Sequence, residues 1–263
     1  MSAFVSGLGV LGPGLWDGAQ ALAALGQDAG LATDVRAPRV AGLSANEARR
    51  CPLVARYALD VGQQALAAAG RDAAHLATVF SSASGDLEIF DKNARALAQS
   101  PPALSPTLFH NSVHNAVAGY WGIAQGTRAA STSLSAYDES FAAGVLEALM
   151  IVDRERQALL IAYDVPPPAA LAAARPITVP FAVAVLFTSE DPSGQAARVA
   201  WRFGVEGEEV TRMPGALEAL RLANPAARAL PFLQTLARRA TRPLILPYVG
   251  GRRLVLEVSH ARP

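Results

Sequence analysis

The stretch LSPTLFHNSVHNAVAGYWGIAQGTRAASTSLSAYDESFAAGVLEA, residues 104–148, decides the fold of this chain. It opens near a Ser-Pro pair, Ser105-Pro106, and small residues interrupt it at Ala118-Gly119 and Gly126. Serines then alternate with other residues, which is typical of a short strand. Asp138 follows at the start of an Ala-rich run, where an acidic residue complements the dipole of a helix. The stretch therefore predicts a helix, a turn, a strand and a second helix.

This arrangement resembles the nucleophile region of the β-ketoacyl synthases, the condensing enzymes of fatty-acid and polyketide synthesis. In that family a Ser-Pro precedes a helix with an Asn and an Ala-Gly, and a Gly-rich turn, a short strand and the reactive Cys follow. Asn115 lies at the matching interval here, but Asp138 occupies the position of the Cys. The resemblance covers roughly residues 1–190, including the opening VSGLGVLGPGL and the SSASGD loop, Ser81 to Asp86.

The chain lacks the other groups that condensation needs. A condensing cycle begins when a thiolate attacks a thioester. The single cysteine, Cys51, lies in a helical pattern far from Asp138, where a small apolar filler is the usual role. An acyl–aspartate anhydride at Asp138 would be labile in water. None of the four histidines (His75, His110, His114 and His260) lies in the Gly-rich contexts that hold the two histidines of the family.

The resemblance implies an α/β, thiolase-like layered fold, mainly the N-terminal ketosynthase half, with a reduced C-terminal part. We expect residues 1–190 to form the ketosynthase-like domain and residues 191–263 to form a reduced extension packed on the same domain. The alternation of strand and helix patterns along the first part indicates an α/β layered fold independently. With 263 residues, 51% of them hydrophobic, the chain is long enough for a sizeable core.

Local patterns predict the individual elements. Apolar runs predict strands over 3–8, 76–82, 130–136, 157–163, 181–189, 197–203, 243–249 and 253–258. Helical spacing predicts helices over 15–25, 53–69, 86–99, 111–123 and 138–153, with further helical patterns in 214–241. The DPSG turn at 191–194 is expected to join two adjacent strands, and Gly250-Gly251 to close a hairpin.

Composition excludes several classes of function. The net charge of +1 argues against an electrostatic nucleic-acid binder. One cysteine excludes an internal disulfide and suits the cytosol. No apolar run approaches the ~20 residues of a membrane span, and the N-terminus lacks the basic segment of a signal peptide, since the first arginine is Arg36. We expect a cytoplasmic protein without a membrane span.

The resemblance also implies residues that face an acyl tunnel or a partner subunit. In homodimeric relatives the segment before the second helix reaches the partner's acyl pocket and helps to limit chain length. The matching positions here are Thr107, Leu108, Phe109, His110, Val113, His114 and Asn115. For the Leu108-Phe109 pair, simple core packing is the alternative. His110 and His114 could share a helix face, but a third ligand is not evident and no metal site is expected.

The strand pattern at 130–136 raises a second question, because Ser131, Ser133 and Ser135 alternate along it and would share one face. No GxSxG elbow marks a serine nucleophile. The explanation consistent with the family is pairing of this strand with its counterpart across a dimer axis. The interface residues that follow from it are Ala130, Thr132, Ser133, Leu134, Ser135, Ala136 and Tyr120, with core burial as the alternative for Tyr120.

The resemblance as a whole implies a non-catalytic subunit similar to the chain-length factors, and in particular to the shortened members of aryl-polyene clusters. Such a subunit would form a heterodimer with a β-ketoacyl synthase that acts on acyl carrier protein, and would shape the acyl tunnel without a cofactor. Asp138 would have no catalytic role. Two alternatives are a stand-alone thiolase-fold acyl-thioester hydrolase or transferase that uses Asp138 with a histidine, and a module that binds acyl chains or carrier protein.

Overall fold

A computed structural model describes residues 2–27, 31–191, 193–205 and 207–260. In this part of the chain, eight strands form one mixed sheet in the order β3-β2-β4-β5-β1-β6-β8-β7, in which β2 runs parallel to β3 and β4 and the other neighbours are antiparallel. The strands are β1 (Ser2–Leu11), β2 (Ala77–Ser81), β3 (Ser131–Leu134), β4 (Gln157–Asp164), β5 (Phe181–Thr188), β6 (Arg198–Gly204), β7 (Arg242–Pro247) and β8 (Arg253–Ser259). The α-helices are α1 (Gly18–Gly26), α2 (Ala45–Arg50), α3 (Leu53–Ala69), α4 (Leu87–Leu97), α5 (Pro106–Asn111), α6 (Ala116–Gln125), α7 (Ser140–Glu155), α8 (Ala216–Ala223) and α9 (Leu230–Ala237). Single 3-10 turns are η1 (Tyr137–Glu139), η2 (Ala169–Leu171), η3 (Ala226–Ala229) and η4 (Val249–Gly251).

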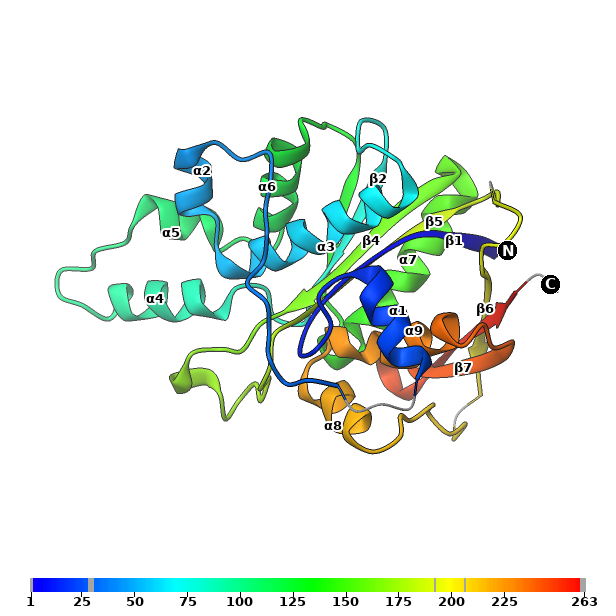
Figure 1. Ribbon diagram of the computed structural model, residues 1–263. Coiled ribbons are helices and arrows are strands. Elements are labelled where there is room, and N and C mark those ends of the chain that lie inside the picture. The colour runs from blue at the N-terminus through cyan, green and yellow to red at the C-terminus, as the bar shows by residue number, and fades with distance from the viewer. Residues whose placement is uncertain (1, 28–30, 192, 206, 261–263) are drawn as a thin grey trace.

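Helices α3 and α6 cover one face of the sheet (Figure 1). Leu159, Ile161 and Tyr163 of β4 point toward these helices and are buried. Because side chains alternate along a strand, Leu160 of β4 points to the opposite face, and it is buried too. Both faces of this central strand are therefore apolar, which explains why it reads as a continuous hydrophobic run.

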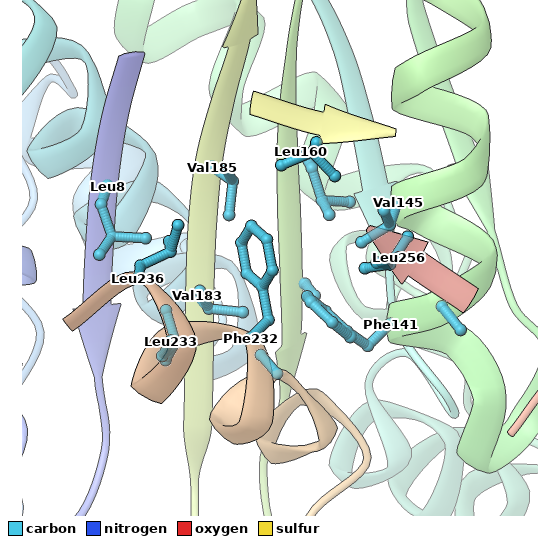
Figure 2. Close-up of a cluster of buried hydrophobic side chains, with 14 of the residues drawn as sticks. Leu8, Phe141, Val145, Leu160, Val183, Val185, Phe232, Leu233, Leu236 and Leu256 are labelled. Atoms are coloured by element: carbon cyan, nitrogen blue, oxygen red, sulfur yellow. The ribbon is translucent and has the colours of Figure 1, made fainter. Parts of the chain in front are cut away.

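A second cluster of buried side chains fills the other face, under α1, α7 and α9. Phe141 of α7 and Phe232 of α9 lie in it beside Val183 of β5 (Figure 2). Leu256 of β8 belongs to the same cluster, so the strands near the end of the chain contribute to this core as well. The core therefore joins residues from the early and the late parts of the chain.

Two glycines of β1 lie where α3 crosses the strand. A Cβ atom on Gly9 would lie 2.0 Å from the carbonyl oxygen of Val61, and one on Gly7 would lie 2.2 Å from that of Ala65. No side chain fits at these distances, so the backbone of α3 packs directly on the backbone of β1. The SGLG sequence of the first strand is thus required by close helix–strand packing.

Gly9→Ala is expected to destabilise the protein by about 3 kcal/mol, because α3 must move away from β1 to admit the methyl group. Gly119→Ala in α6 is the matched control, since a Cβ there meets nothing within 4 Å and alanine favours a helix over glycine by about 1 kcal/mol. The midpoints of urea unfolding of the two variants measure the difference. Equal midpoints would contradict direct contact between the two backbones.

The strands β5 and β6 are not neighbours, which corrects the prediction of two adjacent strands. β1 lies between them and is antiparallel to both: Phe4 pairs with Thr188 of β5 and with Arg198 of β6. The connection at 191–194 therefore crosses the end of β1 instead of closing a hairpin, and its Pro192 lies outside the described residues. Local sequence patterns indicate a strand but not which distant strand it pairs with.

The helix expected over 111–123 begins only at Ala116, and a short helix that was not predicted, α5, precedes it. α5 ends at Asn111 and α6 begins at Ala116. The side-chain amide of Asn111 is buried and donates hydrogen bonds to the carbonyl oxygen of Arg50 and to the hydroxyl of Tyr120. Polar side chains that form such bonds compete with the regular helix, and the chain turns here.

Other local predictions are confirmed with small shifts of their ends. Helix α3 ends before Gly70, whose φ is 60°, and the hairpin β7–β8 turns at Gly250-Gly251. Helix α1 begins later than predicted, after Asp17, which caps it by accepting the N–H of Gln20. β3 is shorter than its predicted range, and a 3-10 turn precedes α7. No helix among the described residues is both long and apolar enough to cross a membrane.

Candidate functional site

Asp138 lies in the turn between β3 and α7. Tyr137, just before it, has a φ of 54°, a left-handed conformation that is rare for a residue with a side chain. Ser140 stabilises the turn, because its hydroxyl donates to the carbonyl oxygen of Tyr137 and accepts the N–H of Ala136. The carbonyl oxygen of Ser140 in turn accepts the hydroxyl of Ser81, the last residue of β2. The turn is thereby fixed beside the carboxyl end of a central strand.

Two arginines bind the carboxylate of Asp138. The guanidinium of Arg175 donates to Oδ1 at 2.7 Å, and that of Arg228 lies 3.5 Å from Oδ2. The side chain of Arg175 is only 9% exposed, that of Arg228 is 17% exposed and that of Asp138 is 38% exposed. Arg175 follows η2, and Arg228 belongs to η3, so three distant segments meet at this carboxylate.

Arg175 is held in place from two further directions. Its Nε donates to the hydroxyl of Ser84 at 2.9 Å, and its guanidinium carbon lies 3.7 Å from the centre of the Tyr137 ring. The SSASGD loop, singled out as a small-residue turn after β2, thus supplies a hydrogen-bond acceptor to the arginine. A carboxylate, a hydroxyl and an aromatic ring thus surround this guanidinium, and its Nη2 is buried without a hydrogen-bond partner among the described residues.

The charges at this site favour an inert carboxylate. Burial and the neighbouring Arg221 lower the pKa of Arg228, and the carboxylate of Asp138 opposes this by favouring its charged form. Every hydrogen bond and ion pair recorded for the Asp138 side chain among the described residues goes to an arginine. Both oxygens of this carboxylate are therefore occupied by guanidinium groups. Among the described residues, the contacts of Asp138 form ion pairs and do not include a paired acid and base.

Cys51, the one thiol, lies at the end of α2 in the cluster under α3 and α6. It is 4% exposed, and burial raises its pKa to about 11. The thiol therefore stays protonated near neutral pH and is a poor nucleophile. The prediction of a buried apolar filler is confirmed.

A buried acid lies close to the arginine site. Asp164, at the end of β4, accepts hydrogen bonds on Oδ1 from the hydroxyl of Ser82 and the N–H of Ala83, both at 2.9 Å. Its Oδ2 is buried and has no hydrogen-bond partner among the described residues. Burial raises the pKa of Asp164 to about 7, although these hydrogen bonds and the charge of Arg175 act in the opposite direction. The carboxyl group of Asp164 therefore titrates near neutral pH.

Asp164 should make the protein less stable as pH rises. Its folded pKa lies above the unfolded value of about 3.9, so the folded state holds the proton more tightly and stability falls between about pH 4 and pH 7. Asp164→Asn is expected to remove this slope and to exceed the parent in stability at pH 8 by about 2 kcal/mol. Urea unfolding from pH 4.5 to pH 8 measures the effect, with the exposed Asp153→Asn as control. If the stabilities of the parent and Asp164→Asn depend on pH in the same way, Asp164 does not cause the predicted loss of stability.

The residues predicted to face a tunnel or a partner lie on α5 and the turn after it. Phe109 and Val113 are 62% and 52% exposed. Thr107, His110 and Asn115 are also exposed, while Leu108 and His114 are half-buried. The two histidines lie on different elements and do not share a helix face. His114 instead lies with its Nε2 3.0 Å from the carbonyl oxygen of Leu134, which joins this turn to the end of β3.

A groove of about 620 Å³ separates α2, α5 and α6. Charged and polar residues line it on the α2 and α5 sides, including Glu47, Arg50 and His110. Val113 and Ile123 add apolar side chains that are more than half exposed. The groove thus adjoins the exposed surface that contains Phe109.

β3 is an edge strand of the sheet with one open side. The N–H of Thr78 donates to the carbonyl oxygen of Ala130, and the N–H of Ser82 donates to that of Leu134. In a parallel ladder, alternate residues bond to the same neighbour, so the backbone of Ser133 points away from β2. No described strand pairs with that side. Its N–H and C=O groups are therefore available to another chain.

The opposite edge, β7, is blocked. Ile245 bonds outward to a single loop residue: its carbonyl oxygen accepts the N–H of Thr211, and its N–H donates to the hydroxyl of Thr211. Pro243 and Pro247, two residues to each side, have no N–H to offer. Prolines and covering loops are common means of preventing edge-to-edge pairing. The contrast between the two edges distinguishes β3 as the one suited to a partner.

The residues predicted at a dimer interface fall into two groups. Ala130 and Ser135 are exposed, and Thr132, Ser133, Leu134 and Ala136 are half-buried, on or beside the open strand. Tyr120 differs, because it is only 6% exposed in the single chain and its hydroxyl donates to the carbonyl oxygen of Arg50. It packs in the cluster with α3 and offers little surface to a partner, so the alternative of core burial holds for it.

Sequence patterns did not identify Arg175, Arg228 or Asp164. Both arginines come from segments read as a linker and as generic helix, and they are two of the many arginines in the chain. Asp164 ends the apolar run of β4, and an acid directly after a buried strand was the one available sign of a polar site there.

Comparisons with known proteins found a matching family and several similar structures. The sequence profile of the β-ketoacyl synthase N-terminal domain matches residues 23–243. No curated protein matches the sequence. Among solved structures, one similar chain belongs to the ketosynthase (ApeO) in complex with its chain length factor (ApeC) from Xenorhabdus doucetiae, with 22% identity and a TM-score of 0.73, covering 98% of this chain and 99% of that one.

Two further structures have the same fold. A chain of the ishigamide ketosynthase/chain length factor is 15% identical, with a TM-score of 0.70 and full coverage of both chains. A β-ketoacyl synthase from Burkholderia phymatum is 12% identical, with a TM-score of 0.66 and 99% coverage of both chains. At these identities the likeness establishes the thiolase-like ketosynthase fold.

Proposed function

The chain belongs to the β-ketoacyl synthase N-terminal domain family, and we propose that it acts there as a non-catalytic subunit similar to the chain-length factors. The observation that carries the proposal is Asp138 at the nucleophile turn, bound by Arg175 and Arg228. Condensation needs a thiolate at that turn, and the only thiol of the chain is buried elsewhere. The partner would then supply the reactive cysteine and both histidines.

The open edge of β3 supports pairing with a second subunit. A strand from a partner would satisfy the outward N–H and C=O groups of Ser133 and extend the sheet across the interface. The exposed side chains of α5 lie next to this edge, because His114 contacts the last residue of β3. A partner docked on β3 would therefore also cover Phe109 and Val113.

Phe109 and Leu108 are proposed to form part of an acyl tunnel that crosses the interface. A phenylalanine that is 62% exposed leaves apolar area in water in the single chain. Ketosynthase chemistry lengthens an apolar chain, and a tunnel that crosses an interface takes its length from side chains of both subunits. The name of one similar structure, a ketosynthase in complex with its chain length factor, supports the same division of labour. We place the complex in type II fatty-acid or polyketide synthesis of the aryl-polyene kind, with acyl carrier protein as its substrate carrier.

Phe109→Ala is expected to lengthen the products of the complex by at least one extension cycle, because it removes the bulkiest exposed side chain of α5. Phe90→Ala on α4 is the matched control, since its ring is exposed to a similar extent, 58%. Mass spectrometry of the carrier-bound products compares the two variants with the parent. Identical product lengths in all three would exclude Phe109 from the tunnel wall.

Co-expression with the ketosynthase of a neighbouring gene tests the proposed function directly. The chain alone is expected to aggregate, because its apolar interface is exposed, and the pair is expected to purify as a stoichiometric complex. Incubation of the complex with a radiolabelled acyl carrier protein should label the ketosynthase alone. Label on this chain, or the lack of any complex, would overturn the proposal. Asp138→Ala should leave condensation by the complex within a few-fold of the parent rate.

The alternative of a stand-alone thioester hydrolase or transferase requires a histidine next to Asp138. The recorded partners of that carboxylate are arginines instead. Turnover of acyl thioesters by the purified chain, lost in Asp138→Ala, would favour this alternative over the subunit role.

A further inference from the structure

A second groove, unrelated to the Asp138 site, lies between α8 and the segments around the start of β5 and the turn after β1. Its volume is about 610 Å³. The residues that line it include Val179, Ala216, Leu217, Ala219, Leu220 and Gln234. It shares no lining residue with the groove beside α5. A volume of this size is in the range of small-molecule sites, roughly 300–1,000 Å³.

None of the described residues that line this groove carries a charge. The charged residues of α8 are turned away and bind each other. Arg221, 5% exposed, donates to both carboxylate oxygens of Glu218, at 2.6 and 2.8 Å, and Glu218 also accepts the N–H of Met213. The helix thus faces the groove with Ala216, Leu217, Ala219 and Leu220 while its ionised groups are satisfied elsewhere.

One buried polar group of the groove has no partner among the described residues. Gln234 of α9 is 4% exposed, and its amide nitrogen forms no hydrogen bond with any described residue. An unsatisfied buried donor costs about 1–3 kcal/mol, so such groups usually donate to something that the chain does not supply. Thr235, the next residue, shows the contrast, since its hydroxyl donates to the carbonyl oxygen of Pro231.

We propose that this groove binds an uncharged, elongated apolar molecule with a carbonyl oxygen, such as a fatty amide or ester, and that the oxygen accepts a hydrogen bond from Gln234. The apolar wall disfavours a free carboxylate or ammonium, because none of the described lining residues carries an opposite charge to compensate its burial. Gln234 is a buried neutral donor, whereas Gln27, Thr33 and Thr178 of the same lining are exposed, so the buried amide favours a carbonyl oxygen. This inference is independent of the role of Asp138 and of any ketosynthase partner.

Dodecanamide is the probe, and its charged counterparts dodecanoate and dodecylammonium are compared with it. Displacement of the neutral dye Nile red, followed by fluorescence, gives the affinities for the parent and for variants, in the isolated chain or in its complex when the chain alone is insoluble. When the complex is used, subtracting the dye displacement of the variant complex from that of the parent complex removes the contribution of binding sites on the partner. We expect one saturable site per chain that prefers dodecanamide to either charged counterpart by at least about tenfold.

Ala219→Trp should fill the groove and abolish saturable binding, with Ala216→Trp as a second filling variant in case the first does not fold. Leu222→Trp, on an exposed position of the same helix, is the matched control and should bind as the parent does. Gln234→Leu should weaken dodecanamide by about five- to tenfold, as loss of one hydrogen bond predicts. Absence of saturable binding, or binding unaffected by both filling variants, would overturn the site. Unchanged affinity in Gln234→Leu would overturn the role of the amide. If the amide of Gln234 donates to a water molecule and the probe does not bind, the proposal is also wrong.

Discussion

Ser133→Pro is expected to abolish association with a ketosynthase partner while leaving the chain folded. Its backbone N–H points away from β2, so a proline there costs no hydrogen bond within the sheet. Across the interface the same change removes a donor and places a ring where a partner strand would lie. Loss of paired backbone groups at the centre of an interface should weaken binding by at least about a hundredfold, or 2.7 kcal/mol.

Thr132→Pro is the matched control, one residue away. The N–H of Thr132 faces β2, so a proline there removes a bond of the sheet itself and should lower the stability of the chain. Co-purification and light scattering report association, and urea unfolding reports stability. A complex that survives Ser133→Pro and the equivalent change at the other outward position, Ser131→Pro, would exclude pairing through β3.

Asp138→Ala is expected to lower the free energy of unfolding by about 2 kcal/mol. Arg175 is 9% exposed, and without Asp138 its described contacts are the Ser84 hydroxyl, the Tyr137 ring and the more distant charge of Asp164. A buried charge without its partner is strongly destabilising, and the partial exposure of Asp138 reduces the effect from the value for a fully buried pair. Chemical unfolding of the parent and the variant under one set of conditions measures it.

Two further variants test whether the loss of stability in Asp138→Ala comes from the unpaired charge of Arg175. Asp138→Ala combined with Arg175→Met should recover part of the lost stability, because the arginine is replaced by an apolar side chain of similar length. Glu190→Ala breaks an ion pair with Arg156 in which both side chains are more than 70% exposed, and it should change stability by less than about 0.5 kcal/mol. If Asp138→Ala costs no more than Glu190→Ala, the arginine pair does not hold the turn.

The sequence predictions that are confirmed depended on residues close together in the chain. Helix α3 follows from its apolar spacing and from Gly70, and the hairpin β7–β8 follows from two glycines between apolar runs. The predictions that failed depended on contacts between distant segments. The break at Asn111 depends on a carbonyl of α2, and the separation of β5 from β6 depends on the first strand of the chain. Spacing along a sequence does not report such partners.

The candidate site shows the same division. The position of Asp138 could be predicted because a family resemblance aligned it with a nucleophile, and local pattern placed it at a helix start. Its two arginines come from η3 and from the segment after η2, 90 and 37 residues away. Nothing in their neighbourhoods distinguishes them from the other arginines of the chain. The chemistry of the site therefore became evident only when the fold had brought the three segments together.

The position of β1 has a consequence for synthesis of the protein on the ribosome. Of the described strands, β1 comes first, and its two neighbours lie far along the chain, since Phe4 pairs with Thr188 and Arg198. Both edges of that strand stay bare until most of the polypeptide has been translated, and pairing over such separations is slow. The edges of β1 in the nascent chain are therefore open to chaperones and to other unfinished chains until β5 and β6 have been translated.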